Sequence, residues 1–206
     1  MLPSDEDFGQ PVSRETRRRF EVFSKTFQTW NGSINLVSRR DAAQLWTRHI
    51  RDSAQLFTLR RPTDWSWLDI GTGGGFPGLI IAILAADTDP DLQVTLVESD
   101  HRKAAFLRSA ALACGVQPKI LTHRAESIPP QAADVVSARA LAPLPQLLEH
   151  ADRHLAPTGR ALFPKGARSD AELASALATW HFTVQKIPSQ TDPEGVILAI
   201  EGVRRA

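Results

Sequence analysis

Several residue types are rare or absent in this chain of 206 residues, which has no tyrosine, one methionine and one cysteine, Cys114. A single cysteine excludes an internal disulfide framework and a cysteine-based metal site. Its place before Gly115, at an expected helix end, favours a small buried filler. No apolar run reaches the roughly 18 residues that a membrane-spanning helix requires, and the acidic, polar start is unlike a secretory signal. We therefore expect a cytoplasmic protein with no membrane association and no bound metal.

The charges nearly balance, at +1 overall, but they are unevenly distributed. Residues 8–61 hold 11 Lys/Arg and four Asp/Glu, whereas residues 62–206 hold 13 Lys/Arg and 16 Asp/Glu. A basic module beside a near-neutral domain indicates an anionic partner, RNA or DNA. A run such as Arg17-Arg18-Arg19 also occurs on solvated helix faces, and this alternative stays open. We predict a helical, basic module over residues 1–62 and a cofactor-binding domain over residues 63–206, together one compact unit.

Hydrophobic spacing and breaker residues predict alternating helices and strands. Ser13 is a candidate N-cap of a helix to about Trp30, and Asn31-Gly32 is expected to end it. One face of this helix carries Phe20, Phe23, Phe27 and Trp30. The other helices are expected at 41–59, 77–86, 101–114, 144–155 and 170–179. The strands are expected at 65–68, 92–98, 119–122, 133–137, 161–163, 182–187 and 196–203, the last two as an antiparallel pair. The order predicts an α/β fold with a seven-stranded, mostly parallel, doubly wound sheet, helices on both faces and an N-terminal helical extension.

A glycine-rich loop follows the first expected strand, where residues 69–78 read Asp-Ile-Gly-Thr-Gly-Gly-Gly-Phe-Pro-Gly. Residues without side chains let a ligand lie against the backbone, and a strand–glycine loop–helix unit binds nucleotide-type cofactors in open α/β sheets. Gly73, Gly75 and Gly78 fit the G-x-G-x-x-G dinucleotide pattern, a weak match when taken alone. A tight turn whose glycines serve packing only is the alternative.

The complete stretch from Asp69, acid-x-Gly-x-Gly-x-Gly, resembles the first motif of S-adenosylmethionine-dependent methyltransferases with a Rossmann-like fold. In that family the loop wraps the methionine and ribose parts of a cofactor that carries no phosphate. Asp69 suits the cationic sulfonium and amino end, whereas it would repel a pyrophosphate. Glu98, 20 residues after Gly78 and at the end of the next strand, suits a ribose contact in either kind of cofactor, or is an exposed strand-end carboxylate.

Further candidates lie where later strands end, because ligands in such sheets bind beyond the carboxyl ends of the strands. Ala125-Glu126 follows the third strand, and Glu126 either hydrogen-bonds near the adenine or ribose or is a solvated loop carboxylate. Arg139 follows the fourth strand and Lys165 ends the fifth. Two cations there suit an anionic substrate such as a nucleic-acid phosphate. A structural ion pair or a surface charge is the alternative for each.

The absence of several known motifs limits which atom of the substrate could accept the methyl group. Ser137-Ala138-Arg139-Ala140 stands where exocyclic amino methyltransferases carry Asn/Asp-Pro-Pro-aromatic. No cysteine is placed for the covalent route to pyrimidine carbon 5, and no Ser/His/Asp arrangement is present. The site suits an acceptor that needs no general base. A ring nitrogen with a free lone pair, such as guanine N7, would attack the methyl group in line, with the enzyme mainly supplying positioning.

Several motifs together resemble the 16S rRNA guanine-N7 methyltransferase G family, also called glucose-inhibited division protein B, across nearly the whole chain. They are Trp30-Asn31 with Asn35-Leu36, Arg48-His49-Ile50 with Asp52-Ser53, residues 68–78, Arg124-Ala125-Glu126, Ala138-Arg139-Ala140 and Lys165-Gly166. The resemblance implies a bacterial enzyme of the class I methyltransferase fold that uses S-adenosylmethionine and methylates one guanine in the decoding-region loop. Its partner would be 16S rRNA, the small ribosomal subunit or an assembly intermediate. We expect a monomer.

The same resemblance assigns roles to residues. The cofactor contacts are Asp69, Gly71, Gly73, Gly75, Phe76, Ala125, Glu126 and Arg139, with Glu98 on the ribose. Arg139 and Lys165, facing the RNA or the target base, are the candidate catalytic residues. His49 and Asp52 would lie where the N-terminal helices meet the cleft, or form a helix-packing histidine and its acceptor. Glu194-Gly195 and Glu201 depart from the family, which often carries basic residues in those regions.

Two other functions remain as alternatives. An NAD(P)-dependent oxidoreductase fits the glycine pattern, but Asp69 and the lack of a tyrosine-based hydride site argue against it. A non-catalytic RNA- or ribosome-binding protein would retain the fold without activity, although the intact glycine loop and its acids argue for catalysis.

Overall fold

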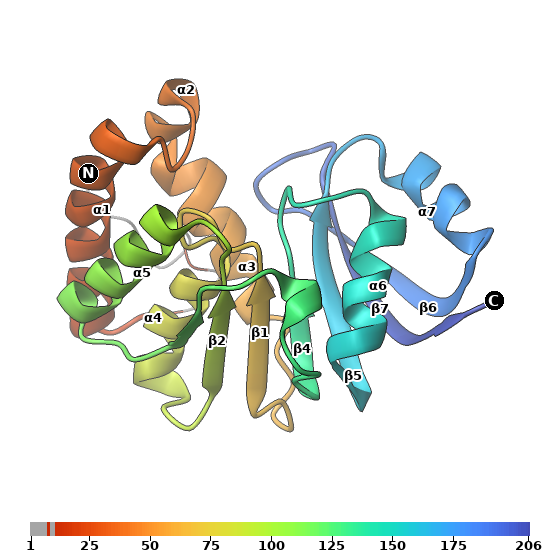
Figure 1. The fold of residues 1–206 in the computed structure, drawn as a ribbon. Coiled ribbons are helices and arrows are strands. Elements are labelled where there is room, and N and C mark those ends of the chain that lie inside the picture. The colour runs from red at the N-terminus through yellow and green to blue at the C-terminus, as the bar shows by residue number, and fades with distance from the viewer. Residues whose placement is uncertain (1–7, 9–10) are drawn as a thin grey trace.

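Helices occupy the N-terminal part of the chain in the computed structural model, which describes residues 8 and 11–206 (Figure 1). The acidic start discussed above, residues 1–7, lies outside the described residues. The first elements are α1 (Arg14–Ile34), α2 (Arg39–Ala42), the π-helical η2 (Leu45–Arg51) and α3 (Asp52–Phe57). The following elements are β1 (Ser66–Ile70), α4 (Gly78–Thr88), β2 (Gln93–Val97), α5 (His101–Cys114), β3 (Lys119–Leu121), η3 (Ala125–Ser127), β4 (Ala133–Ser137), α6 (Leu144–His154), β5 (Leu155–Lys165), α7 (Ser169–Leu177), β6 (Trp180–Pro188) and β7 (Val196–Arg205).

One seven-stranded sheet, in the order β3-β2-β1-β4-β5-β7-β6, organises the molecule. Strands β1 to β5 pair in parallel, and β7 is antiparallel to both β5 and β6. The predicted fold class and the terminal antiparallel pair are therefore confirmed. Strand order reverses between β1 and β4, and the carboxyl ends of these two strands form the switch point at which doubly wound sheets bind ligands.

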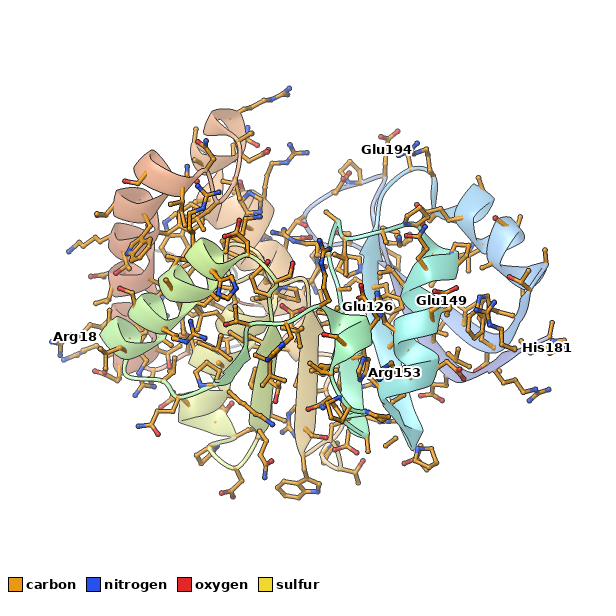
Figure 2. All side chains as sticks on the ribbon, in the orientation of Figure 1. Arg18, Glu126, Glu149, Arg153, His181 and Glu194 are labelled. Carbon is orange, nitrogen blue, oxygen red and sulfur yellow. The ribbon has the colours of Figure 1, made fainter. Side chains whose placement is uncertain are left out.

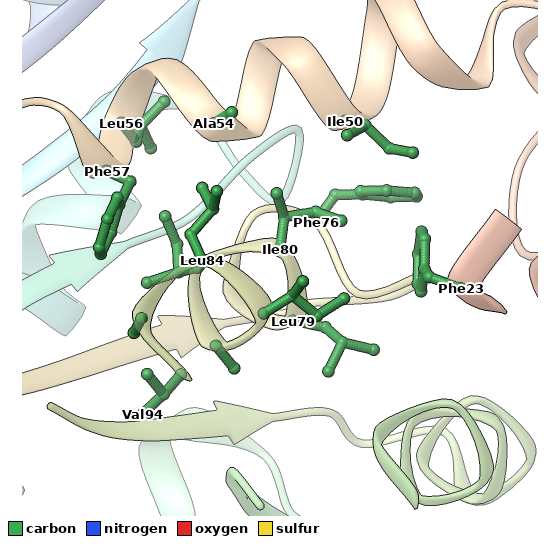
Figure 3. Packing of buried hydrophobic residues seen from close by; sticks show 14 of the residues in the cluster. Phe23, Ile50, Ala54, Leu56, Phe57, Phe76, Leu79, Ile80, Leu84 and Val94 are labelled. Carbon is green, nitrogen blue, oxygen red and sulfur yellow. The ribbon is translucent and has the colours of Figure 1, made fainter. Parts of the chain in front are cut away.

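The sheet separates two apolar cores. Trp67 packs with α1, α3, α4 and α5 on one face, while its neighbour Leu68 packs with α6 and α7 on the other, as the alternation of a strand requires. Helix α4 is buried on all sides from Gly78 to Ala85, because it lies between the sheet and the N-terminal helices. Figure 3 shows this layer: Leu79 and Leu84 lie between Val94 of β2 and the side chains of η2 and α3.

Helix α1 begins as predicted but ends later. The Ser13 hydroxyl accepts a hydrogen bond from the Thr16 amide at 3.1 Å, and the predicted phenylalanine stripe is buried. The expected end at Asn31-Gly32 is wrong, because the helix tolerates this glycine and continues to Ile34. It ends at Asn35, whose left-handed φ of 51° is typical of a helix C-terminus.

Two other expectations are also wrong. The single helix expected over 41–59 is divided into α2, η2 and α3, with a π-helical turn directly at the cleft described below, a common association. The fifth strand begins at Leu155 rather than 161, and the residues expected to stop the helix lie within it. Its register moves from Leu155 opposite Ala133 to Arg160 opposite Val135, an irregularity that accommodates Pro157 and Gly159.

Within residues 8 and 11–206, no helix has the length and apolar character needed to cross a membrane.

Gly78 offers a test of the packing between α4 and the sheet. A Cβ atom there would lie 2.3 Å from Leu96 Cδ2 and 2.6 Å from Asp69 Cβ. We expect Gly78→Ala to lower the free energy of unfolding by about 1–3 kcal/mol, as overpacking does. Urea denaturation measures this. Gly32→Ala is the matched control, because nothing lies within 4 Å of its added Cβ, and it should raise stability by about 0.5–1 kcal/mol. Equal stability of the two variants would contradict the packing argument.

Candidate active site

A cleft of about 970 Å³ lies at the carboxyl ends of β1, β4 and β5, between the N-terminal helices and the β6–β7 connection. Its lining includes the glycine loop, residues 139–143 after β4, and residues 164–166 at the end of β5. Among the predicted site residues, the lining brings together Gly71, Gly73, Phe76, Arg139 and Lys165. The remaining ones, Asp69, Gly75, Glu98, Ala125 and Glu126, do not line it.

Asp69 is fully buried beneath the glycine loop. One carboxylate oxygen accepts from the Gly78 amide at 2.9 Å, and the other accepts from the Ser137 hydroxyl at 2.7 Å. The same hydroxyl accepts from the indole N–H of Trp67 at 2.8 Å. Burial raises the pKa of Asp69 to about 6, although its hydrogen bonds act in the opposite direction. The carboxylate thus joins the end of β1, the end of β4 and the first turn of α4.

Glu98 holds the other side of the loop. It is only 7% exposed, and its two carboxylate oxygens accept from the Gly73 amide at 2.9 Å and the Asp100 amide at 2.8 Å. Gly71, Gly73 and Gly75 all have positive φ values, of 68°, 54° and 91°, which explains why the loop is built from glycine. The loop is therefore fixed at both ends by buried acids at the ends of adjacent strands.

Arg139 is the most constrained cation in the cleft. Its Nη1 donates to the Arg48 carbonyl at 2.9 Å and to Asp52 Oδ2 at 3.1 Å, and its Nη2 lies 2.7 Å from His49 Nδ1. The guanidinium carbon also lies 5.1 Å from the centre of the Phe76 ring, on which His49 stacks at 4.9 Å. The side chain thus connects β4 to η2 and α3, across the cleft.

These contacts determine the tautomer and the charge of the His49 ring. A guanidinium only donates hydrogen bonds, so Nδ1 of His49 is the acceptor and its proton resides on Nε2. Burial and the positive charge of Arg139 lower the pKa of His49 to about 4. The ring is therefore neutral near pH 7. His49 and Asp52, which the sequence placed between two interpretations, both line the cleft and both contact Arg139.

Lys165 has partners of its own. Its Nζ donates to Glu172 Oε2 at 2.8 Å and to the Ala142 carbonyl at 3.0 Å. Glu172 Oε2 also accepts from the Leu144 amide at 2.8 Å. The lysine side chain is 9% exposed and joins β5, α7 and the segment after Arg139.

Ala125 and Glu126 lie in η3, beyond β3 and away from the lining of the cleft. The buried Ala125 carbonyl lies 3.1 Å from His154 Nε2, and Glu126 is exposed (Figure 2). Within residues 8 and 11–206, no group of three or more His, Cys, Asp or Glu side chains is placed to hold a metal ion.

Several further residues of the cleft are not marked by any sequence motif. Leu141 lies over the loop, since a Cβ on Gly71 would be 2.6 Å from its Cδ1. Gln55, Ser189 and Thr191 also line the cleft and form one hydrogen-bonded group. No motif marks them, although the buried position of Gln55 on an apolar helix face was a signal that a polar network lies there.

The shifted pKa values of His49 and Asp69 predict opposite effects of pH on stability. His49 has a folded pKa below its unfolded value, so its contribution is complete above about 6.5 and is lost as pH falls towards about 4. Asp69 has a raised pKa, so its contribution is complete below about 3.8 and is lost as pH rises through about 6. Urea denaturation from pH 4 to 7 should give a stability that rises less with pH in His49→Gln, and more in Asp69→Asn, than in the wild type. Slopes unchanged in both variants would refute these assignments.

Comparison with protein families gives a match over residues 16–197 to GidB, rRNA small subunit methyltransferase G. Relatives named ribosomal RNA small subunit methyltransferase G cover nearly the whole chain. The one from Ruegeria sp. (strain TM1040) is 54% identical over 194 residues, which is 94% of each protein. The one from Gluconobacter oxydans (strain 621H) is 48% identical over 194 residues, covering 94% of this chain and 97% of the relative.

Solved structures support the fold at much lower identity. The mitomycin 7-O-methyltransferase MmcR superposes with a TM-score of 0.62 at 17% identity, covering 94% of this chain and 69% of that one. A ribosomal protein L11 methylase from Lactobacillus delbrueckii subsp. bulgaricus gives a TM-score of 0.59 at 17% identity, over 75% of this chain and 78% of that one. With the family match and the relatives at 48–54% identity, the chain belongs to the GidB family of rRNA small subunit methyltransferase G proteins.

Proposed function

We propose that the chain transfers a methyl group from S-adenosylmethionine to N7 of a guanine in 16S rRNA of the small ribosomal subunit. Membership of the family and the methyltransferase fold support the reaction class. The observation that carries the proposal is that one cleft contains both the glycine loop and Arg139. A cofactor on the loop and a base beside Arg139 would therefore lie in the same cleft.

The loop fits a cofactor with a ribose and no phosphate. An added Cβ on Gly73 would meet only the Gly71 carbonyl, at 3.8 Å, so the space beside this glycine is open to the cleft that it lines. The Glu98 carboxylate bonded to Gly73 is an acceptor suited to ribose hydroxyls. When bound, S-adenosylmethionine supplies an electrophilic methyl group. We assign its contacts to Gly71, Gly73, Gly75, Phe76 and Glu98, with Ala125, Glu126 and Arg139 as further contacts. Asp69, which is fully buried, would serve cofactor binding by holding the loop from below.

The acceptor requires positioning more than proton transfer, because guanine N7 carries a free lone pair. His49 is a poor general base because its pKa is lowered to about 4 and its Nδ1 already faces Arg139, and a protonated guanidinium cannot accept a proton, which suits such an acceptor. We propose that Arg139 orients the target nucleotide. Lys165 would support this role by holding residues 142–144 through Ala142 and Glu172.

The distribution of charge supports further proposals about partners. The excess of Lys/Arg over residues 8–61 suits contact with the rRNA phosphates. We propose that the N-terminal helical module, residues 1–62, contacts the ribosomal RNA while residues 63–206 bind the cofactor. We further propose that the protein acts as a cytoplasmic monomer.

The central test uses small subunits purified from cells that lack this gene. Incubation with the protein and S-adenosylmethionine, followed by mass spectrometry of the digested 16S rRNA, should show one new 7-methylguanosine. Arg139→Ala should lower kcat/KM by about 100-fold, the size of loss expected from a misplaced reactant. Arg205→Ala, an arginine whose side chain is 60% exposed and pairs with Glu149 on α6, should retain wild-type activity. Wild-type protein that leaves the rRNA unchanged would refute the proposed function.

Cofactor binding is tested separately by isothermal titration calorimetry. Glu98→Ala should weaken S-adenosylmethionine binding at least tenfold, as expected when a charged hydrogen-bond acceptor is lost. Glu126→Ala should have a smaller effect, because its side chain is exposed. Glu149→Ala, on the surface of α6, is the matched control and should leave the affinity unchanged. Tight binding of NAD in place of S-adenosylmethionine would instead favour an oxidoreductase.

A further inference from the structure

The connection between β6 and β7, residues 189–195, reaches towards α3 (Figure 1) and lines the cleft. Glu194 marks the outer edge of this connection in Figure 2. Gln55 of α3 anchors it: Gln55 Nε2 lies 3.2 Å from Ser189 Oγ, and Gln55 Oε1 accepts from the Gln190 amide at 2.9 Å. Gln55 is only 3% exposed, so its amide is committed to these partners.

Asp52 continues the network towards the reaction centre. Its Oδ1 accepts from the Thr191 hydroxyl at 2.7 Å and from Gln55 Nε2 at 2.8 Å. Its Oδ2 accepts from Arg139 Nη1 at 3.1 Å. Hydrogen bonds therefore run without interruption from the 189–195 connection through one carboxylate to the arginine.

We propose that Gln55 and Thr191 are positioning residues that couple the placement of the 189–195 connection to the orientation of Arg139 through Asp52. This inference rests on the proposed function, in which Arg139 orients the target nucleotide. A carboxylate held at one oxygen only is free to rotate about its side-chain bonds. Donors on the second oxygen remove that freedom, and the low exposure of Asp52 and Arg139, 17% and 16%, strengthens each bond.

The 189–195 connection also lies where the substrate would enter. Asp192, Pro193 and Gly195 line the same cleft, so an RNA strand that enters it meets the connection that holds Thr191. Displacement of the connection would remove the Thr191 hydroxyl from Asp52 and loosen Arg139. Seating of the connection would align Arg139 again. The placement of the substrate and the alignment of the arginine would thus be linked through the connection.

The test compares two substitutions at one position. Thr191→Val keeps the shape and removes the hydroxyl, and it should lower kcat about tenfold while the dissociation constant of S-adenosylmethionine stays within twofold. Thr191→Ser keeps the hydroxyl and should stay within twofold of the wild-type kcat. A wild-type kcat in Thr191→Val would overturn the coupling. If the wild-type protein does not methylate small subunits at all, the proposed function itself is refuted.

A double-mutant cycle separates coupling from a purely structural role. If Thr191 acts through Arg139, Thr191→Val should change kcat less than twofold in an Arg139→Lys background, because the arginine geometry is already lost. Independent tenfold losses in both backgrounds would overturn the inference.

Gln55→Met supplies a second variant of similar size without hydrogen-bonding groups. Hydrogen exchange should show faster exchange at the Gln190 amide, which loses its acceptor, together with a reduced kcat. Faster exchange with an unchanged kcat would show that the connection and Arg139 are independent.

Discussion

The buried carboxylate of Asp69 is the interaction on which the cleft depends. It binds the Gly78 amide and the Ser137 hydroxyl, which belong to α4 and β4, while its own backbone lies in β1. The same carboxylate that fixes the end of the glycine loop through one oxygen fixes Ser137, two residues before Arg139, through the other. A displaced carboxylate would therefore move both the cofactor-binding loop and the proposed acceptor side. Its burial is costly, as the pKa of about 6 indicates, and the hydrogen bonds from Ser137 and Gly78 offset part of that cost.

Arg139 extends this organisation to the N-terminal helices. Burial lowers the pKa of its guanidinium, and the Asp52 carboxylate opposes that effect. A buried cation requires acceptors, and all those described here, the Arg48 carbonyl, His49 and Asp52, come from η2 and α3. The basic N-terminal segment is therefore a wall of the cleft as well as the surface proposed to contact the rRNA. The π-helical turn is part of this arrangement, because the carbonyl of Arg48 lies within it.

The sequence predicts what depends on local patterns. The strand–loop–helix unit around Gly73, the phenylalanine stripe of α1 and the alternation after residue 65 follow from spacing and breaker residues alone. Gln55 and Thr191 are 136 residues apart, and no periodicity connects them. The partners of Asp69 and Lys165 were likewise hidden, since each acid or base could equally have faced a ligand. Local rules also misplaced the end of α1, because the left-handed residue was Asn35 rather than the glycine three positions before it.

The pairing of the cations in the cleft bears on selectivity. Arg139 and Lys165 already have carboxylate partners, Asp52 and Glu172, so a passing phosphate gains little by approaching them. A ligand must share or replace these bonds with good geometry, which favours a nucleotide held in one orientation. Under the proposed function, Arg48 and Arg168, which line the cleft and are exposed, would supply the less selective attraction for a polyanion. Attraction would then reside in these exposed arginines and selection in Arg139, in the way that phosphate contacts position an interface and base contacts specify it.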